Sequence, residues 1–283
     1  MNFGTFITSV KPERISIHVR RAEELGYESA WIGEHLIMPV KSQSKYPYSA
    51  DGSFPAPLDV PFNDPMLTLA YAAAHTSKIR LATGIYVVPM RNAISTAKAV
   101  ATLDVLSSGR AIFGVGVGWW AEEFALAGAS FGDRALRTRE SIELMKELWT
   151  SDEPAYHGKT ISLEGARFNP KPVQKPHPPI VVGGTTELAL KRAVRYGDGW
   201  YGIAKTHDDA EVLIGRLRAL ERDAGRSRPV EITLSLRTGK PLTIDDMRRL
   251  KTAGVDRALV GSPVKALTED ELARFREEVI ERI

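Results

Sequence analysis

The side chain best suited to move a proton in this sequence is His35, which follows the largely apolar run Ser29–Gly33 with Glu34 beside it. An imidazole titrates near neutral pH and can donate, accept or shuttle a proton. A lone histidine is more often structural, but this one stands where an expected strand ends and the chain leaves the core. His35 is therefore a candidate catalytic residue, and Glu34 a candidate substrate-pocket residue.

A second candidate for chemistry is the run Gly183, Gly184 and Thr185, which directly precedes an expected helix that begins near Thr186. Glycines at a helix N-terminus leave backbone N–H groups free to bind an anion, and the helix dipole favours negative charge there. The alternative is a tight turn in which Thr185 or Thr186 serves only as the helix N-cap. Two consecutive glycines exceed what a cap needs, so the pattern favours a phosphate site.

Glycines also punctuate the segment Gly114–Gly118, in the order Gly114, Val115, Gly116, Val117, Gly118. A dinucleotide fingerprint needs a third glycine that opens a helix after the first strand, and this segment instead ends the fourth expected strand and continues into WWAEEF. Two interpretations remain: close approach of a cofactor to the backbone of Gly116, Val117 and Gly118, or relief of side-chain crowding at a strand end.

Two further features border the same strand ends. Gly84, followed by Ile85, interrupts an otherwise apolar strand, which is typical either of a packing bulge or of a surface for a planar ring. Trp119 and Trp120 lie just past the glycine run. They can wall an aromatic substrate pocket, or one can cover the barrel while the other packs on a neighbouring loop.

Several classes of function are disfavoured by composition. The 283 residues include no cysteine, so thiolate chemistry and disulfides are excluded, and no HxH, HExxH or GxSxG pattern predicts a metal site or a serine nucleophile. The net charge of +3 comes from interleaved basic and acidic residues, which does not indicate a nucleic-acid partner. No run suits a membrane helix and no leader pattern opens the chain, so we expect a soluble, cytoplasmic protein that acts on a small molecule.

The elements that position these residues alternate between strand and helix. Eight strand–helix units can be counted, from Asn2–Ile7 to Arg257–Val260, which predicts an α/β protein: one (β/α)8 TIM-barrel domain over residues 1–283. Insertions follow strands, notably the second and fourth: a flap at 34–62 and segments at about 119–131 and 155–178. An open doubly wound sheet ranks second, because no crossover resembles a switch point.

Five segments, in order along the chain, resemble the bacterial luciferase-like flavin and deazaflavin oxidoreductases. They are RRAEELGYESAWIGEHLIMP, IRLATGIYVVPMRN, TLDVLSSGRAIFGVGVGWWAEEF, FNPKPVQKPHPPIVVGG and RAVRYGDGW. The flap sequence YPYSADG and the ending GVGVGWWAEEF are most similar to the subgroup of probable coenzyme F420-dependent oxidoreductases. The resemblance implies a barrel that binds F420, or alternatively FMN, at its C-terminal mouth, and it implies no particular substrate.

The resemblance assigns roles residue by residue. Gly84–Ile85 matches a pair joined by a non-proline cis peptide that backs the flavin ring. His35 matches a histidine near the reactive ring carbon of related deazaflavin dehydrogenases. Gly116 to Gly118 and Gly183 to Thr185 match backbone segments that hold the cofactor's side chain and phosphate.

One departure from the family bears on the substrate. Related sugar-phosphate dehydrogenases carry a proton-donating glutamate just after the strand-four glycines, where this chain has Trp119. The departure argues against sugar-phosphate oxidation and favours an apolar or planar substrate. The resulting prediction is hydride transfer with F420 in a homodimer. The alternatives are an FMN monooxygenase supplied by a separate flavin reductase, and a flavin-binding barrel without turnover.

Overall fold

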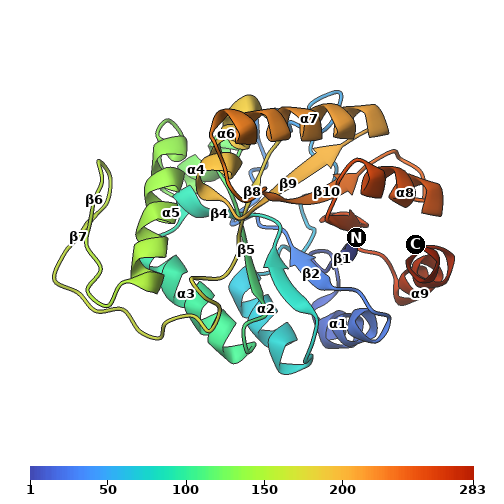
Figure 1. Cartoon of the computed structure of the whole chain (residues 1–283), viewed down its shortest axis with the longest axis horizontal. Coiled ribbons are helices and arrows are strands. Elements are labelled where there is room, and N and C mark those ends of the chain that lie inside the picture. The colour runs from blue at the N-terminus through green and yellow to red at the C-terminus, as the bar shows by residue number, and fades with distance from the viewer.

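A closed barrel of parallel strands forms the centre of the chain, as the computed structural model of residues 1–283 shows (Figure 1). The sheet has nine strands, but β4 continues β3 after two residues, so there are eight positions around the barrel. The strands are β1 (Asn2–Phe6), β2 (Ser29–Ile32), β3 (Arg80–Thr83), β4 (Tyr86–Val87), β5 (Ala111–Gly116), β8 (Ile180–Gly183), β9 (Gly199–Ala204), β10 (Glu231–Leu236) and β11 (Arg257–Val260). The ring closes because β11 pairs with β1 and β3 pairs with β5.

Helices surround the strands (Figure 1). Those of the barrel are α1 (Ile15–Glu24), α2 (Pro65–Ala74), α3 (Ala93–Leu106), α5 (Arg134–Thr150), α6 (Glu187–Tyr196), α7 (His207–Asp223), α8 (Ile244–Thr252) and α9 (Glu269–Glu278); short 3₁₀ turns span Pro12–Arg14, Val88–Met90 and Ile280–Arg282. Local sequence fixes their starts: Asp64 accepts hydrogen bonds from the Met66 and Leu67 N–H groups with Pro65 at the first position. No helix is both long and apolar enough to cross a membrane.

Two hydrophobic clusters hold the barrel. The larger contains 54 buried residues and fills the space between strands and helices. The smaller fills the interior of the barrel with seven, namely Phe6, Trp31, Ala82, Ile112, Val181, Tyr201 and Leu259. The partly buried side chains of Ile85 and Ile203 pack on this inner cluster. The interior is thus a packed core on which a site can be built.

A buried ion-pair network ties together the beginnings of three strands. Arg257, 1% exposed, donates to both oxygens of Glu28 at 2.7 and 2.8 Å, to Glu231, and to the Thr233 hydroxyl at 3.0 Å. Arg257 begins β11 and Glu231 begins β10, so the network lies at the end of the barrel opposite the strand C-termini. A side chain so fully enclosed needs these partners to offset its desolvation.

The predicted (β/α)8 architecture is confirmed, and the open doubly wound sheet is wrong. The predicted third strand is split, because Gly84 and Ile85 separate β3 from β4, and their peptide bond is cis, as the resemblance implies. The segment after the fourth predicted strand contains α4 (Ala121–Leu126), and the next segment contains the antiparallel hairpin of β6 (Tyr156–His157) and β7 (Ser162–Leu163). That hairpin projects from one side of the molecule in Figure 1.

Candidate functional site

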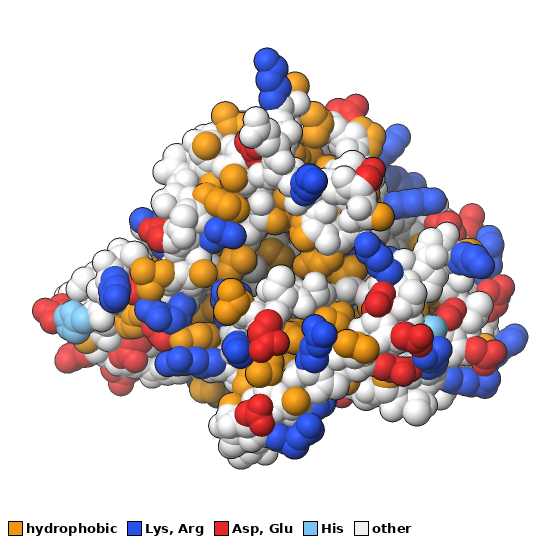
Figure 2. Space-filling model, turned by 90° about the horizontal axis from the view of Figure 1, so that it is seen from above, with side chains coloured by type: hydrophobic (Ala, Val, Ile, Leu, Met, Phe, Trp, Pro, Cys, Tyr) orange, Lys and Arg blue, Asp and Glu red, His pale blue; other side chains and the backbone are white.

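A cavity of about 540 Å³ opens at the C-terminal ends of the barrel strands. Its lining is mainly apolar and includes eleven of the twelve residues proposed from the sequence: Glu34, His35, Gly84, Ile85, Gly116, Val117, Gly118, Trp119, Gly183, Gly184 and Thr185. On the face shown in Figure 2, hydrophobic side chains gather around a hollow near its middle. Residues predicted from separate strand ends therefore meet at one place.

His35 is held in the cavity wall by a carboxylate from α4. Its Nδ1 lies 2.9 Å from Glu123 Oε2, and Glu123 Oε1 accepts the Leu36 N–H at 2.6 Å. The two side chains are 10% and 3% exposed. In the neutral ring the carboxylate accepts Nδ1–H, so Nε2 is left with a lone pair; in the imidazolium Nε2 is a donor. The pair can therefore exchange a proton through Nε2.

Aromatic rings enclose His35. The centroids of Phe62, Phe54 and Trp120 lie 4.9, 5.1 and 5.3 Å from that of His35, all in edge-to-face geometry. Trp119 stacks on Trp120 at 4.7 Å. Such packing fixes the imidazole orientation and makes this part of the cavity apolar.

Trp120, predicted to belong to the substrate pocket, does not line the cavity. It is 3% exposed behind Trp119, and its Nε1 donates to the Ser42 hydroxyl at 2.7 Å. Nearby, the half-buried Glu122 accepts the Gln43 N–H with its carboxylate at 2.6 Å. These bonds tie α4 to the 34–62 segment, which supplies Tyr46, Tyr48, Phe54 and Phe62 to the cavity wall. Trp119 thus faces the cavity while Trp120 anchors the segment that covers it.

Glu34 reaches the cavity wall, but both of its oxygens are occupied. One bonds Arg91, and the other accepts the Val87 N–H at 2.5 Å. Burial raises the pKa of Glu34, and the Arg91 charge opposes that shift. Arg91 also lies 3.6 Å from Asp64. The arrangement joins the end of β2 to β4 and α2, so it supports the wall of the cavity.

Ile85 forms the floor of the cavity, and two glycines make room for it. A Cβ on Gly116 would lie 2.4 Å from Ile85 Cδ1, and one on Gly183 would lie 2.7 Å from Ile85 Cγ2. Gly118 has φ +75°, a conformation that favours glycine. Relief of crowding, the second of the two interpretations drawn from the sequence, therefore accounts for Gly116, and it leaves room for the apolar Ile85 side chain in the cavity lining.

Cationic and N–H donors gather at the side of the cavity formed by the start of α6. Thr186 caps this helix by accepting the Ala189 N–H at 3.3 Å, so Thr185 precedes the cap. Arg192, one turn further along α6, and Arg134 at the start of α5 line the same cavity. Arg134 also leaves its buried Nε without a partner. Together these groups match the requirements of a phosphate.

Several residues that line the cavity were not proposed as site residues from the sequence: Glu123, Tyr46, Tyr48, Arg134, Arg192, Tyr201 and Arg237. Arg237 follows the last residue of β10, so the strand-end rule that singled out His35 could also have found it. Glu123, Arg134 and Arg192 lie on helices, so no position at a strand end could have indicated them. The chain has no group of three or more His, Asp or Glu side chains placed to hold a metal ion.

Comparison with known proteins places this geometry in context. The profile of a family described as luciferase-like monooxygenase matches residues 1–257. An uncharacterised protein of Mycobacterium tuberculosis (strain ATCC 25618 / H37Rv) is 35% identical over 287 residues, which cover 100% of this chain and 99% of the relative. An F420-dependent glucose-6-phosphate dehydrogenase of Kineococcus radiotolerans is 30% identical over 282 residues, covering 95% and 76%.

Among solved structures, the coenzyme F420 dependent tetrahydromethanopterin reductase from Methanopyrus kandleri superposes with a TM-score of 0.78. The match covers 99% of this chain and 98% of that one at 22% identity. At this identity the match shows that the two chains share a fold.

Proposed function

The chain belongs to the luciferase-like monooxygenase family of oxidoreductases, and we propose that it uses coenzyme F420 to transfer a hydride to or from a small organic substrate. The observation that carries the proposal is one cavity whose lining brings together the apolar Ile85, the glycines before α6 with Arg192 on that helix, and His35 with its carboxylate partner Glu123. The relative named as F420-dependent supports the choice of cofactor.

The residues present fit this cofactor. Ile85, with the glycines beneath it, offers a flat surface for a tricyclic ring, and the start of α6 with Arg192 and Arg134 offers donors for a phosphate. When bound, the deazaflavin supplies a carbon that accepts or donates a hydride. The protein would orient the cofactor and the substrate, provide complementary charges and exclude water.

His35 is the proposed acid or base. Hydride transfer to or from a carbon bearing oxygen or nitrogen requires a matching proton transfer, and Nε2 of His35 is the group free to make it. Glu123 fixes the tautomer and stabilises the imidazolium when the ring holds a second proton. The 34–62 segment covers this pair with aromatic rings, which excludes water from the reacting atoms.

The substrate is proposed to differ from that of the sugar-phosphate relative. The family resemblance implies a glutamate at the position of Trp119 in sugar-phosphate dehydrogenases, whereas Trp119 lines the cavity here with an indole. Glu123, one turn later, is already committed to His35 and Leu36. A flat or apolar substrate suits this wall better than a sugar ring does.

The alternative is an FMN-dependent monooxygenase that receives reduced flavin from a separate reductase. The family description names monooxygenases, and the same phosphate-binding side would suit FMN. Deazaflavin chemistry is restricted to hydride transfer, whereas reduced FMN also activates oxygen, so the cofactor decides the reaction class. A barrel that binds flavin without turnover is the third possibility.

Turnover with each cofactor tests the proposal. The protein is incubated without oxygen with reduced or oxidised F420 and a panel of planar alcohols, ketones and enones, and the absorbance of oxidised F420 is followed. We expect turnover that His35→Ala abolishes and that His157→Ala, a change at an exposed histidine on the β6–β7 hairpin, leaves intact. Oxygen-dependent product formation with reduced FMN alone would favour the monooxygenase. F420 binding without any turnover, unaffected by His35→Ala, would favour the inactive barrel.

A homodimer remains a further proposal. Helices α2 and α3 expose apolar side chains, among them Leu67 at 74%, Leu106 at 64% and Tyr71 at 47%. Exposed apolar groups on neighbouring helices are typical of an interface between subunits. Sedimentation of the wild type should give a dimer and Leu67→Glu a monomer, whereas a wild-type monomer at micromolar concentration would contradict the proposal.

A further inference from the structure

We propose that Arg237 is the subsite for an anionic group of the substrate, and that the substrate is a flat, largely apolar molecule bearing a carboxylate or a similar oxyanion. The inference rests on the proposed function, because it assigns a substrate class to the same cavity. Arg237 is distinct from the groups proposed to bind the cofactor's phosphate, because those groups lie on α5 and α6 whereas Arg237 follows β10.

Arg237 is a cation without a counter-ion. Its Nη1 donates to the Tyr46 hydroxyl at a long 3.3 Å, and its buried Nε has no partner. No carboxylate forms an ion pair with it, whereas the half-buried guanidinium of Arg91 and the buried one of Arg257 are both paired with glutamates. A guanidinium in an apolar cavity is stabilised by an anion, and no side chain here supplies one.

The carboxylates that share the cavity are not free to turn towards Arg237. Glu34 is bonded to Arg91 and to the Val87 N–H, and Glu123 is bonded to His35 and to the Leu36 N–H. The groups around Arg237 are instead neutral hydroxyls: Tyr46, Tyr201 and, 3.1 Å from the Tyr201 hydroxyl, Ser235. Neutral donors beside an unpaired arginine complete a site for an oxyanion.

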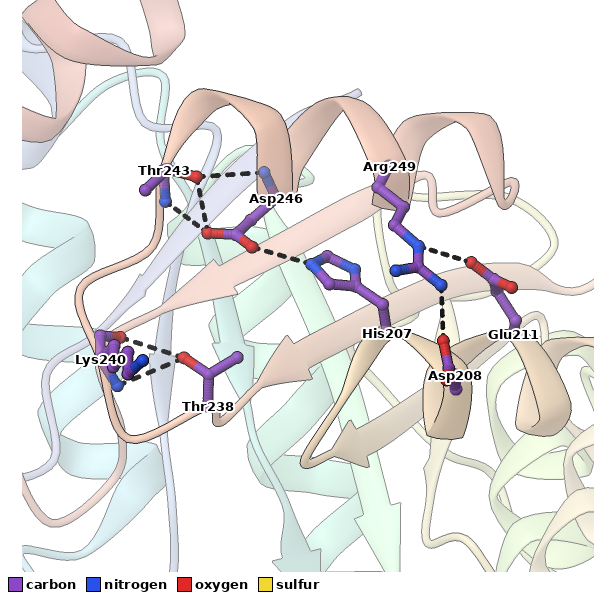
Figure 3. Close-up of polar contacts among 8 residues, drawn as sticks. All are labelled: His207, Asp208, Glu211, Thr238, Lys240, Thr243, Asp246 and Arg249. Atoms are coloured by element: carbon purple, nitrogen blue, oxygen red, sulfur yellow. Dashed lines mark hydrogen bonds and ion pairs between the residues drawn. The ribbon is translucent and has the colours of Figure 1, made fainter.

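The segment that follows Arg237 is anchored on the neighbouring helices (Figure 3). Thr238 forms a turn with Lys240, and Thr243 and Asp246 form a reciprocal capping box at the start of α8. His207, the first residue of α7, points towards Asp246, with 2.8 Å between Nε2 and Oδ1. Arg237 therefore follows the end of β10 directly, and the segment after it is held by hydrogen bonds up to the start of α8. A residue that binds a ligand needs such a fixed backbone.

The aromatic residues that lie between Arg237 and His35 indicate what the rest of the ligand, apart from its anionic group, must be. Tyr46 bonds Arg237 and packs edge-on against Trp119 at 5.3 Å, and Trp119 lies 6.2 Å from His35. A molecule with its anion on Arg237 would thus lie along aromatic rings to reach the imidazole. Rings recognise flat apolar surfaces, and they offer no partners for the hydroxyls of a sugar.

Two isosteric probes test the inference: 2-naphthoate and its uncharged analogue 2-naphthamide. Their binding is measured by calorimetry, with the protein alone and with the protein saturated with F420. We expect the carboxylate to bind about 10-fold or more tightly than the amide, the range for one charge-assisted contact in a partly buried site. Arg237→Gln should remove this preference and Arg237→Lys should keep part of it. Arg216→Gln, a change at an exposed and unpaired arginine of α7, should leave it intact.

The inference is overturned if the two probes bind equally, if neither binds, or if the preference survives in Arg237→Gln. It is overturned as well if Arg192→Gln removes the preference instead, or if Arg237→Gln weakens only F420. Oxidation of glucose 6-phosphate would contradict the flat apolar body. Failure of the proposed function can be distinguished from failure of this inference. If F420 does not bind, the comparison of the two probes on the protein alone still tests Arg237. Circular dichroism and thermal unfolding confirm that each variant is folded.

Discussion

Replacing Gly116 with alanine tests how the floor of the cavity is built. The added Cβ would lie 2.4 Å from Ile85 Cδ1 and 3.0 Å from Cγ1, well inside ordinary contact. Gly116 is fixed in the sheet opposite Val87, so the Ile85 side chain must move. Overpacking of this kind costs about 1 to 3 kcal/mol of unfolding free energy. A displaced Ile85 would also disturb the surface proposed for the ring, so F420 binding should weaken.

The assay is a double-mutant cycle with Ile85→Val, which removes the Cδ1 atom that clashes. Urea unfolding and F420 titration are measured for both single variants and the double variant. The double variant should recover at least about 1 kcal/mol of the loss, since contacting residues are coupled. Gly132→Ala, where a Cβ meets nothing within 4 Å, is the matched control. Strictly additive losses would refute the account of Ile85 as a side chain accommodated by glycine.

Three further predictions follow from the contacts of other residues. Glu123→Gln should lower turnover about 10-fold or more with F420 affinity unchanged, because His35 loses the carboxylate that sets its tautomer; equal losses in affinity and turnover would indicate a structural role. Arg192→Gln should weaken F420 about 10-fold but leave a deazaflavin lacking the phosphate unaffected in calorimetry. Arg257→Met should cost about 1 to 3 kcal/mol in urea unfolding, because Glu28 and Glu231, whose side chains are 23% and 42% exposed, lose the guanidinium that both contact. Burial tends to raise the pKa of Glu28, but the hydrogen bonds and charge of Arg257 outweigh it and the net pKa is lowered. The stability from that pair is therefore present above the ordinary pKa of Glu28 and lost as pH falls through the lowered one. In Arg257→Met this contribution is absent, so the unfolding free energy should fall less steeply as pH drops below the ordinary pKa of Glu28, and an unchanged slope would contradict the assignment.

The barrel could be predicted from the sequence because each unit carries its own signals. Apolar runs of strand length alternate with amphipathic helices that open on residues such as Asp64 and Pro65. Closure follows from the number of units rather than from any single residue. Local signals placed an interruption of the third strand at Gly84 and Ile85, but they could not decide between a packing bulge and a surface for a ring, since that depends on what fills the barrel beneath it.

The candidate site was predictable where chemistry sits at strand ends. His35 was found by that rule, Gly183 to Thr185 were found by the glycines that precede a helix, and all of them line one cavity. The His35–Glu123 contact spans 88 residues and depends on the orientation of α4, which no local pattern encodes. The crowding of Gly116 by Ile85 likewise arises only when β4 and β5 are paired. Long-range packing, more than residue type, decides these features.

Competition between the two cofactors tests the central claim most directly. Wild-type protein is titrated with F420 and with FMN, each alone and against the other, while the fluorescence of the five tryptophans is followed. The account predicts saturable F420 binding at one site per chain, with FMN at least about 10-fold weaker, a difference of roughly 1.4 kcal/mol. Tight FMN binding that F420 cannot displace would contradict it.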